Sequence, residues 1–195
     1  MAQFQPRQIL GKWQQGFALD LHTLSSVPIG HNEFGHMQFD TRRSEIGELL
    51  FCLKNRGDTT TVPEIVATAA RFIASWQPPI DMIVPVPPSG ARAVQPVILL
   101  ARGLSAAIQL PLVQCVTKTS DTSRLKNIYD LDERLKALEG VHVVDPMATK
   151  GRNILLFDDL FRSGATMNAI TTALYREGQA AQVFALTITR TRSLQ

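Results

Sequence analysis

The fold of this chain is decided by one stretch, Asn153-Ile-Leu-Leu-Phe-Asp-Asp-Leu-Phe-Arg-Ser-Gly-Ala-Thr166. Its apolar run, Ile154 to Phe157, is typical of a β-strand that is buried on both faces of a sheet. Two acids, Asp158 and Asp159, stop the run at its carboxyl end, where open α/β sheets form their ligand crevice. The stretch therefore predicts a buried strand that delivers two carboxylates to a binding site.

A turn of small residues, Ser163 to Thr166, follows these acids, and a helical pattern begins at about Met167. Gly164 permits a tight turn, and the backbone amides of this turn would point at an anion on the helix N-terminus. Acids beside such a cradle predict a pocket for a sugar phosphate. A surface pair of acids that caps a helix is the plainer alternative. A Walker B strand is disfavoured because the chain holds no G-x-x-x-x-G-K-[ST] motif.

The stretch resembles the phosphoribosyl pyrophosphate (PRPP) signature of type I phosphoribosyltransferases. That signature is a hydrophobic strand, two acids, a hydrophobic and a variable residue, two small hydroxyl residues, and Gly-x-Thr, and here it spans Ile154 to Thr166. Arg162 departs from it, because the family usually has Thr or Ser at that place. Two further segments resemble the ComF-like branch, the competence-associated, amidophosphoribosyltransferase-like proteins: Leu53 to Asp58, and Ile83 to Ser89 with Arg92 and Gln95.

This resemblance implies three groups of site residues. The catalytic group is Asp158, Asp159 and Lys118, of which the two acids would engage the ribose hydroxyls and hold Mg²⁺, directly or through water. The residues for the PRPP 5′-phosphate are Arg162, Ser163, Gly164, Ala165 and Thr166. The residues for the pyrophosphate are Ser89, Gly90, Ala91 and Arg92. Arg92 also fits a solvated first turn of a helix, and Lys54 and Arg56 are explained by the negative end of the helix that they close.

Composition and charge limit which classes of protein this chain can belong to. The 195 residues are 45% hydrophobic and 19% charged, which suits one domain with a real core. A net charge of +3 suits anionic small molecules and does not demand nucleic acid. Cys52 and Cys115 stand far apart and are expected to be free thiols, no Cys/His spacing indicates zinc, and neither a signal peptide nor a membrane span is expected. We therefore expect a cytoplasmic protein.

The alternation of strand and helix patterns predicts a single phosphoribosyltransferase-like domain, residues 1–195, of the α/β class with a doubly wound, mainly parallel sheet. Residues 1–44 are expected to form a small N-terminal cap, the family's hood, and residues 45–195 the α/β core. In the cap, polar residues are candidates either for a substrate pocket or for ordinary surface: His31, Asn32, His36 and Arg42. The charged segment of about 120–140 resembles the family's flexible catalytic loop, or else forms a solvated helix face.

The function that the resemblance implies is transfer of a phosphoribosyl group from PRPP, with Mg²⁺, to a nitrogen nucleophile, with release of pyrophosphate, in nucleotide metabolism. The partners would be PRPP and a small-molecule acceptor, with room for a homodimer. Arg162 and a shortened Ser89 loop leave open a non-catalytic alternative, a PRPP or nucleotide sensor or a DNA-uptake accessory protein. A hydrolase that consumes PRPP without an acceptor is a third interpretation. No motif identifies the acceptor.

Overall fold

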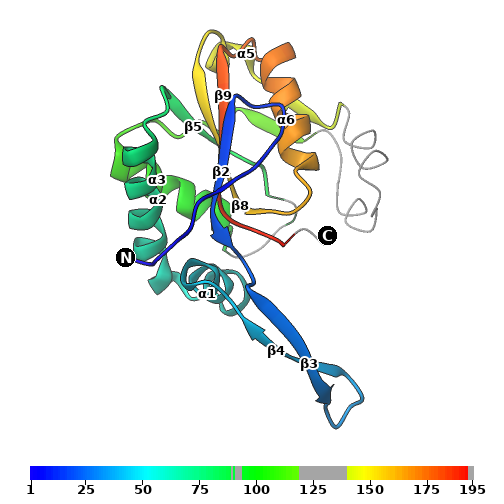
Figure 1. Ribbon diagram of the computed structural model, residues 1–195. Coiled ribbons are helices and arrows are strands. Elements are labelled where there is room, and N and C mark those ends of the chain that lie inside the picture. The colour runs from blue at the N-terminus through cyan, green and yellow to red at the C-terminus, as the bar shows by residue number, and fades with distance from the viewer. Residues whose placement is uncertain (89, 91–93, 119–139, 193–195) are drawn as a thin grey trace.

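A five-stranded sheet forms the centre of the computed structural model, which describes residues 1–88, 90, 94–118 and 140–192 (Figure 1). The strand order is β1-β2-β9-β8-β5; β1 is antiparallel to β2, and every other neighbouring pair is parallel. The strands are β1 (Arg7–Gln8), β2 (Gln15–Leu21), β9 (Gln182–Arg190), β8 (Asn153–Phe161) and β5 (Met82–Pro85). This mainly parallel sheet confirms the predicted α/β class.

The strand β8 lies between β9 and β5, and Ile154 to Phe157 are buried on both of its faces. It does not end at the acids as the sequence predicted. It continues through both of them to Phe161, because Asp158 and Leu160 keep their parallel register with β9. The polar side chains do not interrupt the pairing of β8 with β9, because backbone groups form its hydrogen bonds. Since successive side chains of a strand point to opposite faces, the two acids leave the sheet on different sides.

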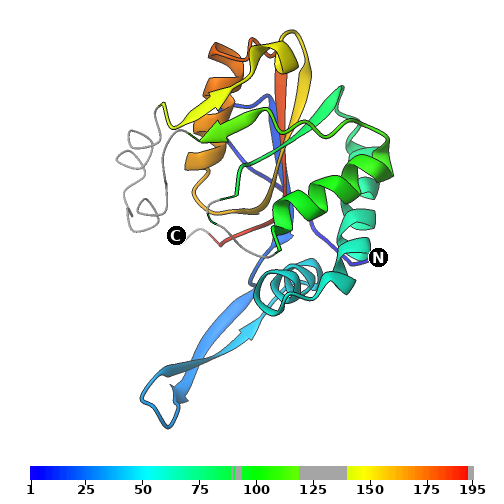
Figure 2. The same ribbon diagram turned by 180° about the vertical axis from the view of Figure 1, so that it is seen from behind.

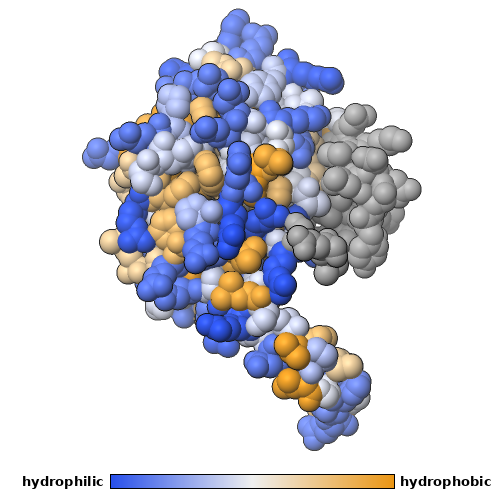
Figure 3. Space-filling view, in the orientation of Figure 1, coloured by the Kyte–Doolittle hydropathy of each residue, from blue (hydrophilic) through white to orange (hydrophobic). Residues whose placement is uncertain are grey.

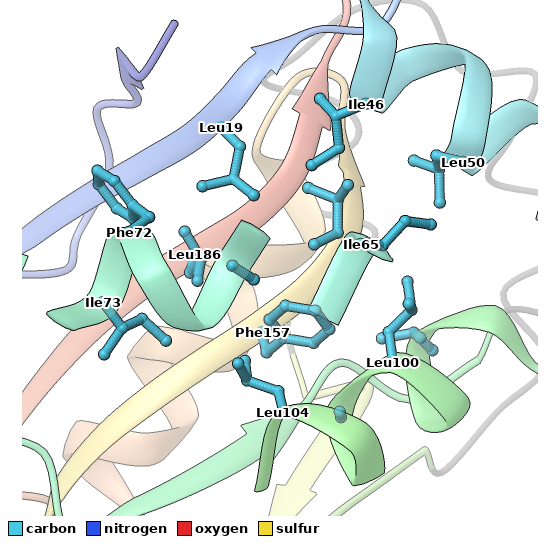
Figure 4. Packing of buried hydrophobic residues seen from close by; sticks show 14 of the residues in the cluster. Leu19, Ile46, Leu50, Ile65, Phe72, Ile73, Leu100, Leu104, Phe157 and Leu186 are labelled. Atoms are coloured by element: carbon cyan, nitrogen blue, oxygen red, sulfur yellow. The ribbon is translucent and has the colours of Figure 1, made fainter. Parts of the chain in front are cut away.

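Helices cover both faces of the sheet (Figures 1 and 2). On one face lie α1 (Glu45–Phe51), α2 (Val62–Trp76) and α3 (Pro96–Ile108), which bury Leu155, Phe157 and Leu186. Figure 4 shows Phe157 and Leu186 among the side chains of these helices. On the other lies α6 (Ala165–Arg176), which buries Ile154, Leu156 and Ala185. The sheet is therefore doubly wound, and its carboxyl edge stays between the two helical layers.

Short elements complete the core. A π-helical turn, η1 (Cys52–Arg56), continues α1, and a 3-10 turn, η2 (Thr59–Thr61), precedes α2. The helix α5 (Pro146–Thr149) follows a two-stranded pair, β6 (Val116–Lys118) with β7 (His142–Val144). Before β6, Leu112 forms a single parallel bridge with Ile83 of β5. No helix within the described ranges is long and apolar enough to cross a membrane.

The first 44 residues divide between two places. β2 lies inside the main sheet, whereas β3 (Ser25–His31) and β4 (Met37–Arg42) form a hairpin that extends away from it (Figures 1 and 2). Figure 3 shows hydrophobic residues on the surface of the hairpin. The exposed apolar side chains of the hairpin are Val27, Ile29, Phe34, Met37 and Phe39. A cap over the core was expected from this segment, and its role as a hood stays a prediction.

Candidate functional site

A pocket with a cavity volume of about 80 Å³ opens at the carboxyl end of β8. Its lining consists of Asp158 and the continuous segment Leu160 to Met167. The strand, the turn and the start of α6 thus bring one acid of the predicted signature and all five predicted 5′-phosphate residues into one pocket. The helix begins at Ala165, two residues earlier than expected, so Ala165 and Thr166 belong to its first turn. The first amides of a helix have no acceptor within the helix and are available to an anion.

Gly164 shapes this pocket. Its φ of 76° lies in the left-handed region, and it is the N-cap of α6. A Cβ atom here would stand 2.8 Å from Cζ of Phe161, whose ring packs edge-on against Trp13 at 6.1 Å. Backbone conformation and space therefore both demand glycine. Arg162 and Ser163 beside it are exposed, and the Ser163 hydroxyl accepts a long hydrogen bond of 3.5 Å from the Ala165 amide.

Asp158 is half-buried, and its Oδ1 accepts the amide of Asp159 at 2.8 Å. Burial, followed by the neighbouring carboxylate of Asp159, raises the pKa of Asp158 to about 8. The Asp159 amide and the ammonium groups of Lys54 and Lys118 act in the opposite direction. A perturbed acid in a pocket is a common mark of a functional site, and a cationic ligand or hydroxyl donors would favour its charged form.

Asp159 leaves β8 on the side of α1 and does not line the pocket. Its Oδ1 lies 2.8 Å from Nζ of Lys54 in the turn η1. The sequence pattern had explained Lys54 by the helix dipole alone, so this ion pair was missed. The one available signal was the short ComF-like segment Leu53 to Asp58, which contains the lysine but says nothing of its partner.

Lys118, the third predicted catalytic residue, ends β6 and donates a hydrogen bond of 2.8 Å from Nζ to the carbonyl oxygen of Pro88. It therefore lies beside the loop predicted to bind pyrophosphate. In that loop Gly90 is exposed, and its carbonyl accepts from Nε2 of Gln95 at 2.8 Å. Three other predicted residues, Ser89, Ala91 and Arg92, lie outside the described residues. Residues 120–139 of the charged segment that resembles the family's catalytic loop also lie outside the described residues.

The candidate pocket residues of the hairpin lie elsewhere. His31, His36 and Arg42 are exposed on β3, β4 and the turn between them. The Oδ1 of Asn32 accepts the amides of Phe34 and His36 at 3.0 and 2.9 Å, so this side chain shapes the turn. None of the four lines the pocket beside β8, which favours the surface interpretation of these residues.

The resemblance implies Mg²⁺, and the oxygen donors of this site fit that ion only if the ligand supplies part of its coordination shell. Among the residues that the structure describes, no group of three or more His, Cys, Asp or Glu side chains could hold a metal ion. Mg²⁺ at phosphate sites commonly takes one or two carboxylates and completes its shell with substrate oxygens and water. Asp158 faces the pocket and Asp159 is its neighbour in the chain. These two acids fit an Mg²⁺ ion that arrives bound to a diphosphate, and do not fit an ion coordinated by protein side chains alone.

Comparison with known proteins gives structural relatives only. No family model and no curated protein matches the chain. The glutamine PRPP amidotransferase of B. subtilis, solved with ADP and GMP, superposes with a TM-score of 0.51 at 18% identity, over 80% of this chain and 34% of its own. A structure described as the allosteric regulatory enzyme of purine biosynthesis gives the same values. An adenine phosphoribosyltransferase covers 84% of both chains at 17% identity, with a TM-score of 0.43.

These similarities establish the fold: the chain has the α/β fold of type I phosphoribosyltransferases, as its PRPP-like signature predicted. It spans about a third of the length of the amidotransferase. The narrower ComF-like assignment and the roles of individual site residues stay predictions.

Proposed function

We propose that this protein binds PRPP at the carboxyl end of β8 and transfers its phosphoribosyl group to a nitrogen nucleophile. One observation carries the proposal: Asp158 and the turn Arg162 to Thr166 line a single pocket at the N-terminus of α6. A sugar phosphate needs hydroxyl acceptors and an anion site side by side. The fold of the structural relatives agrees with this assignment, and PRPP appears in the name of the B. subtilis enzyme.

The chain's own residues supply binding and orientation. The amides of the first turn of α6 and the turn before it would hold the 5′-phosphate, with the hydroxyl of Thr166 beside them. Asp158, with Asp159 next to it, would accept hydrogen bonds from the ribose hydroxyls and place negative charge near the ring. That charge stabilises the positive character that develops at C1′ as the bond to pyrophosphate breaks.

Lys118 would meet the departing pyrophosphate. Its ammonium lies next to Pro88, at the start of the loop predicted to bind that group. Bound Mg²⁺ would supply charge neutralisation on the pyrophosphate oxygens. A neutralised leaving group departs more readily: the C1′–O bond to pyrophosphate would break, the nitrogen nucleophile would form the C1′–N bond, and its proton would pass to solvent water.

The direct test is incubation of the protein with PRPP, MgCl₂ and a pool of bases and amines, followed by mass spectrometry. A new ribosyl phosphate product, with one pyrophosphate released for each, is the expected result. Consumption of PRPP in the absence of any acceptor would instead indicate a hydrolase.

A second candidate, a non-catalytic PRPP or nucleotide sensor, is favoured by one feature. Arg162 occupies a position where the resembled signature has a small hydroxyl residue, and it lies at the exposed rim of the pocket. A sensor would bind PRPP with Mg²⁺ and release no pyrophosphate with any acceptor. Binding and turnover measured on the same sample separate the two functions.

A further inference from the structure

The two acids of β8 have different surroundings, and a lysine outside the PRPP-like signature accounts for much of the difference. Asp158 lines the pocket beside the turn, whereas Asp159 is paired with Lys54 on the other side of the strand. The Lys54 and Asp159 side chains are only 21% and 13% exposed. An ion pair so shielded from water is screened weakly by salt, so its charges act on the neighbouring pocket.

Lys54 is held in place by the structure around it. Its neighbour Leu53 is 1% exposed in the core, and Gly57, with a φ of 69°, ends the π-helical turn. At the other end of the segment, the Ser44 hydroxyl donates to the carbonyl of Leu21 and accepts the amide of Gly47. The segment from Ser44 to Gly57 is therefore fastened to the end of β2. Single π-helical turns that interrupt or continue an α-helix frequently occur at functional sites.

The ion pair has two consequences for an anionic ligand. Lys54 occupies Oδ1 of Asp159, which fixes the rotamer of the acid and leaves Oδ2 for another donor. It also offsets the charge of Asp159. Without it, two adjacent carboxylates would repel the phosphates of a substrate at the same edge of the sheet.

We infer that Lys54 is a positioning residue of the site, which fixes and neutralises Asp159 so that a polyanionic sugar phosphate can bind beside two acids. The inference rests on the proposed function and deepens it. Lys54 and Asp159 then act as one unit, while Asp158 lines the pocket beside the turn. Neither the PRPP-like signature nor the fold comparison assigns a role to this lysine.

The test is a double-mutant cycle on the affinity for PRPP with MgCl₂, measured by titration calorimetry on Lys54→Met, Asp159→Asn and their combination. We expect Lys54→Met to weaken binding about tenfold or more, as is typical for residues that orient a ligand-binding group. The combined variant should bind no more weakly than the poorer single variant, since the pair acts as a unit. Lys54→Arg, which keeps the charge, should restore most of the affinity.

Two controls separate positioning from folding. Lys150→Met removes an exposed positive charge next to the amino end of β8, far along the strand from the acids, and should leave the affinity unchanged. Lys54→Gln can still donate a hydrogen bond to Asp159 and is measured in parallel, in case Lys54→Met does not fold. The melting temperature of each variant establishes that the titrated protein is folded.

The outcomes are distinguishable. Absence of PRPP binding in the unmodified protein would refute the proposed function and this inference with it. Normal binding by the unmodified protein together with unchanged affinity in folded Lys54→Met and Lys54→Gln would overturn the role of Lys54 alone. Additive losses in the cycle, or no recovery in Lys54→Arg, would also overturn it.

Discussion

Replacement of Gly164 by alanine tests how the turn forms the pocket. The backbone φ of 76° is left-handed, which costs an L-residue about 1–2 kcal/mol. The new methyl would also stand 2.8 Å from Cζ of Phe161. That ring is 8% exposed and packed on Trp13, so it yields only by disturbing the core. Such overpacking typically costs about 1–3 kcal/mol.

Together these effects predict a loss of about 3 kcal/mol in the free energy of unfolding. For a chain of this size, that loss corresponds to a fall of roughly 6–12 °C in melting temperature. Gly151→Ala is the matched control, because Gly151 has a similar φ of 69° but a Cβ atom there would meet nothing within 4 Å. The control should carry the backbone cost of about 1–2 kcal/mol and no overpacking.

Chemical denaturation measures both stabilities, and calorimetry with PRPP and MgCl₂ measures ligand affinity at a temperature where both variants are folded. Gly164→Ala should lose PRPP affinity by about tenfold or more, because the methyl and the displaced ring crowd a turn whose amides must approach the phosphate. Gly151→Ala should bind normally. Equal destabilisation of the two variants with equal PRPP affinity would refute the reasoning.

Three further predictions concern charged groups. In the folded state the pKa of Asp158 is raised from 3.8 to about 8. The stability that this group contributes is therefore fully present below pH 3.8 and is lost as the pH rises through about 8. Asp158→Asn should raise the melting temperature near pH 8 and leave it unchanged near pH 4. Burial, and then the charge of Lys118, lowers the pKa of His142 from 6.5 to about 4. The stability that this group contributes is therefore present above pH 6.5 and is lost as the pH falls toward 4. In His142→Gln the melting temperature should fall less over this pH range than in the unmodified protein, and an equal fall in both proteins would contradict the prediction. Lys118→Met should slow pyrophosphate release roughly 100-fold, with partial recovery in Lys118→Arg, and an unchanged rate would remove Lys118 from the site.

Local patterns made the centre of the fold predictable. The apolar run of β8, the acids and the small-residue turn are contiguous, so one stretch of sequence contains the strand, the bend and the start of α6. Ser44 and Gly57 likewise mark the two ends of the helical segment α1–η1 by capping rules that need only neighbouring residues. The pocket follows from the same local geometry.

Features that depend on distant partners were not predictable. Lys54 and Asp159 are 105 residues apart in the chain, and nothing near either residue signals the other. The placement of β2 depends on its pairing with β9, which turned part of the expected cap into a strand of the main sheet. The extension of β8 through its acids has the same origin, since hydrogen bonds to β9 override the polar side chains.

We propose that Asp158 and the turn after β8 together form one PRPP site. Titration calorimetry of PRPP with MgCl₂ into the unmodified protein and into Asp158→Asn tests it most directly. We expect saturable binding to the unmodified protein and loss of binding in Asp158→Asn, with the variant still folded. Equal affinity in the two proteins would contradict it.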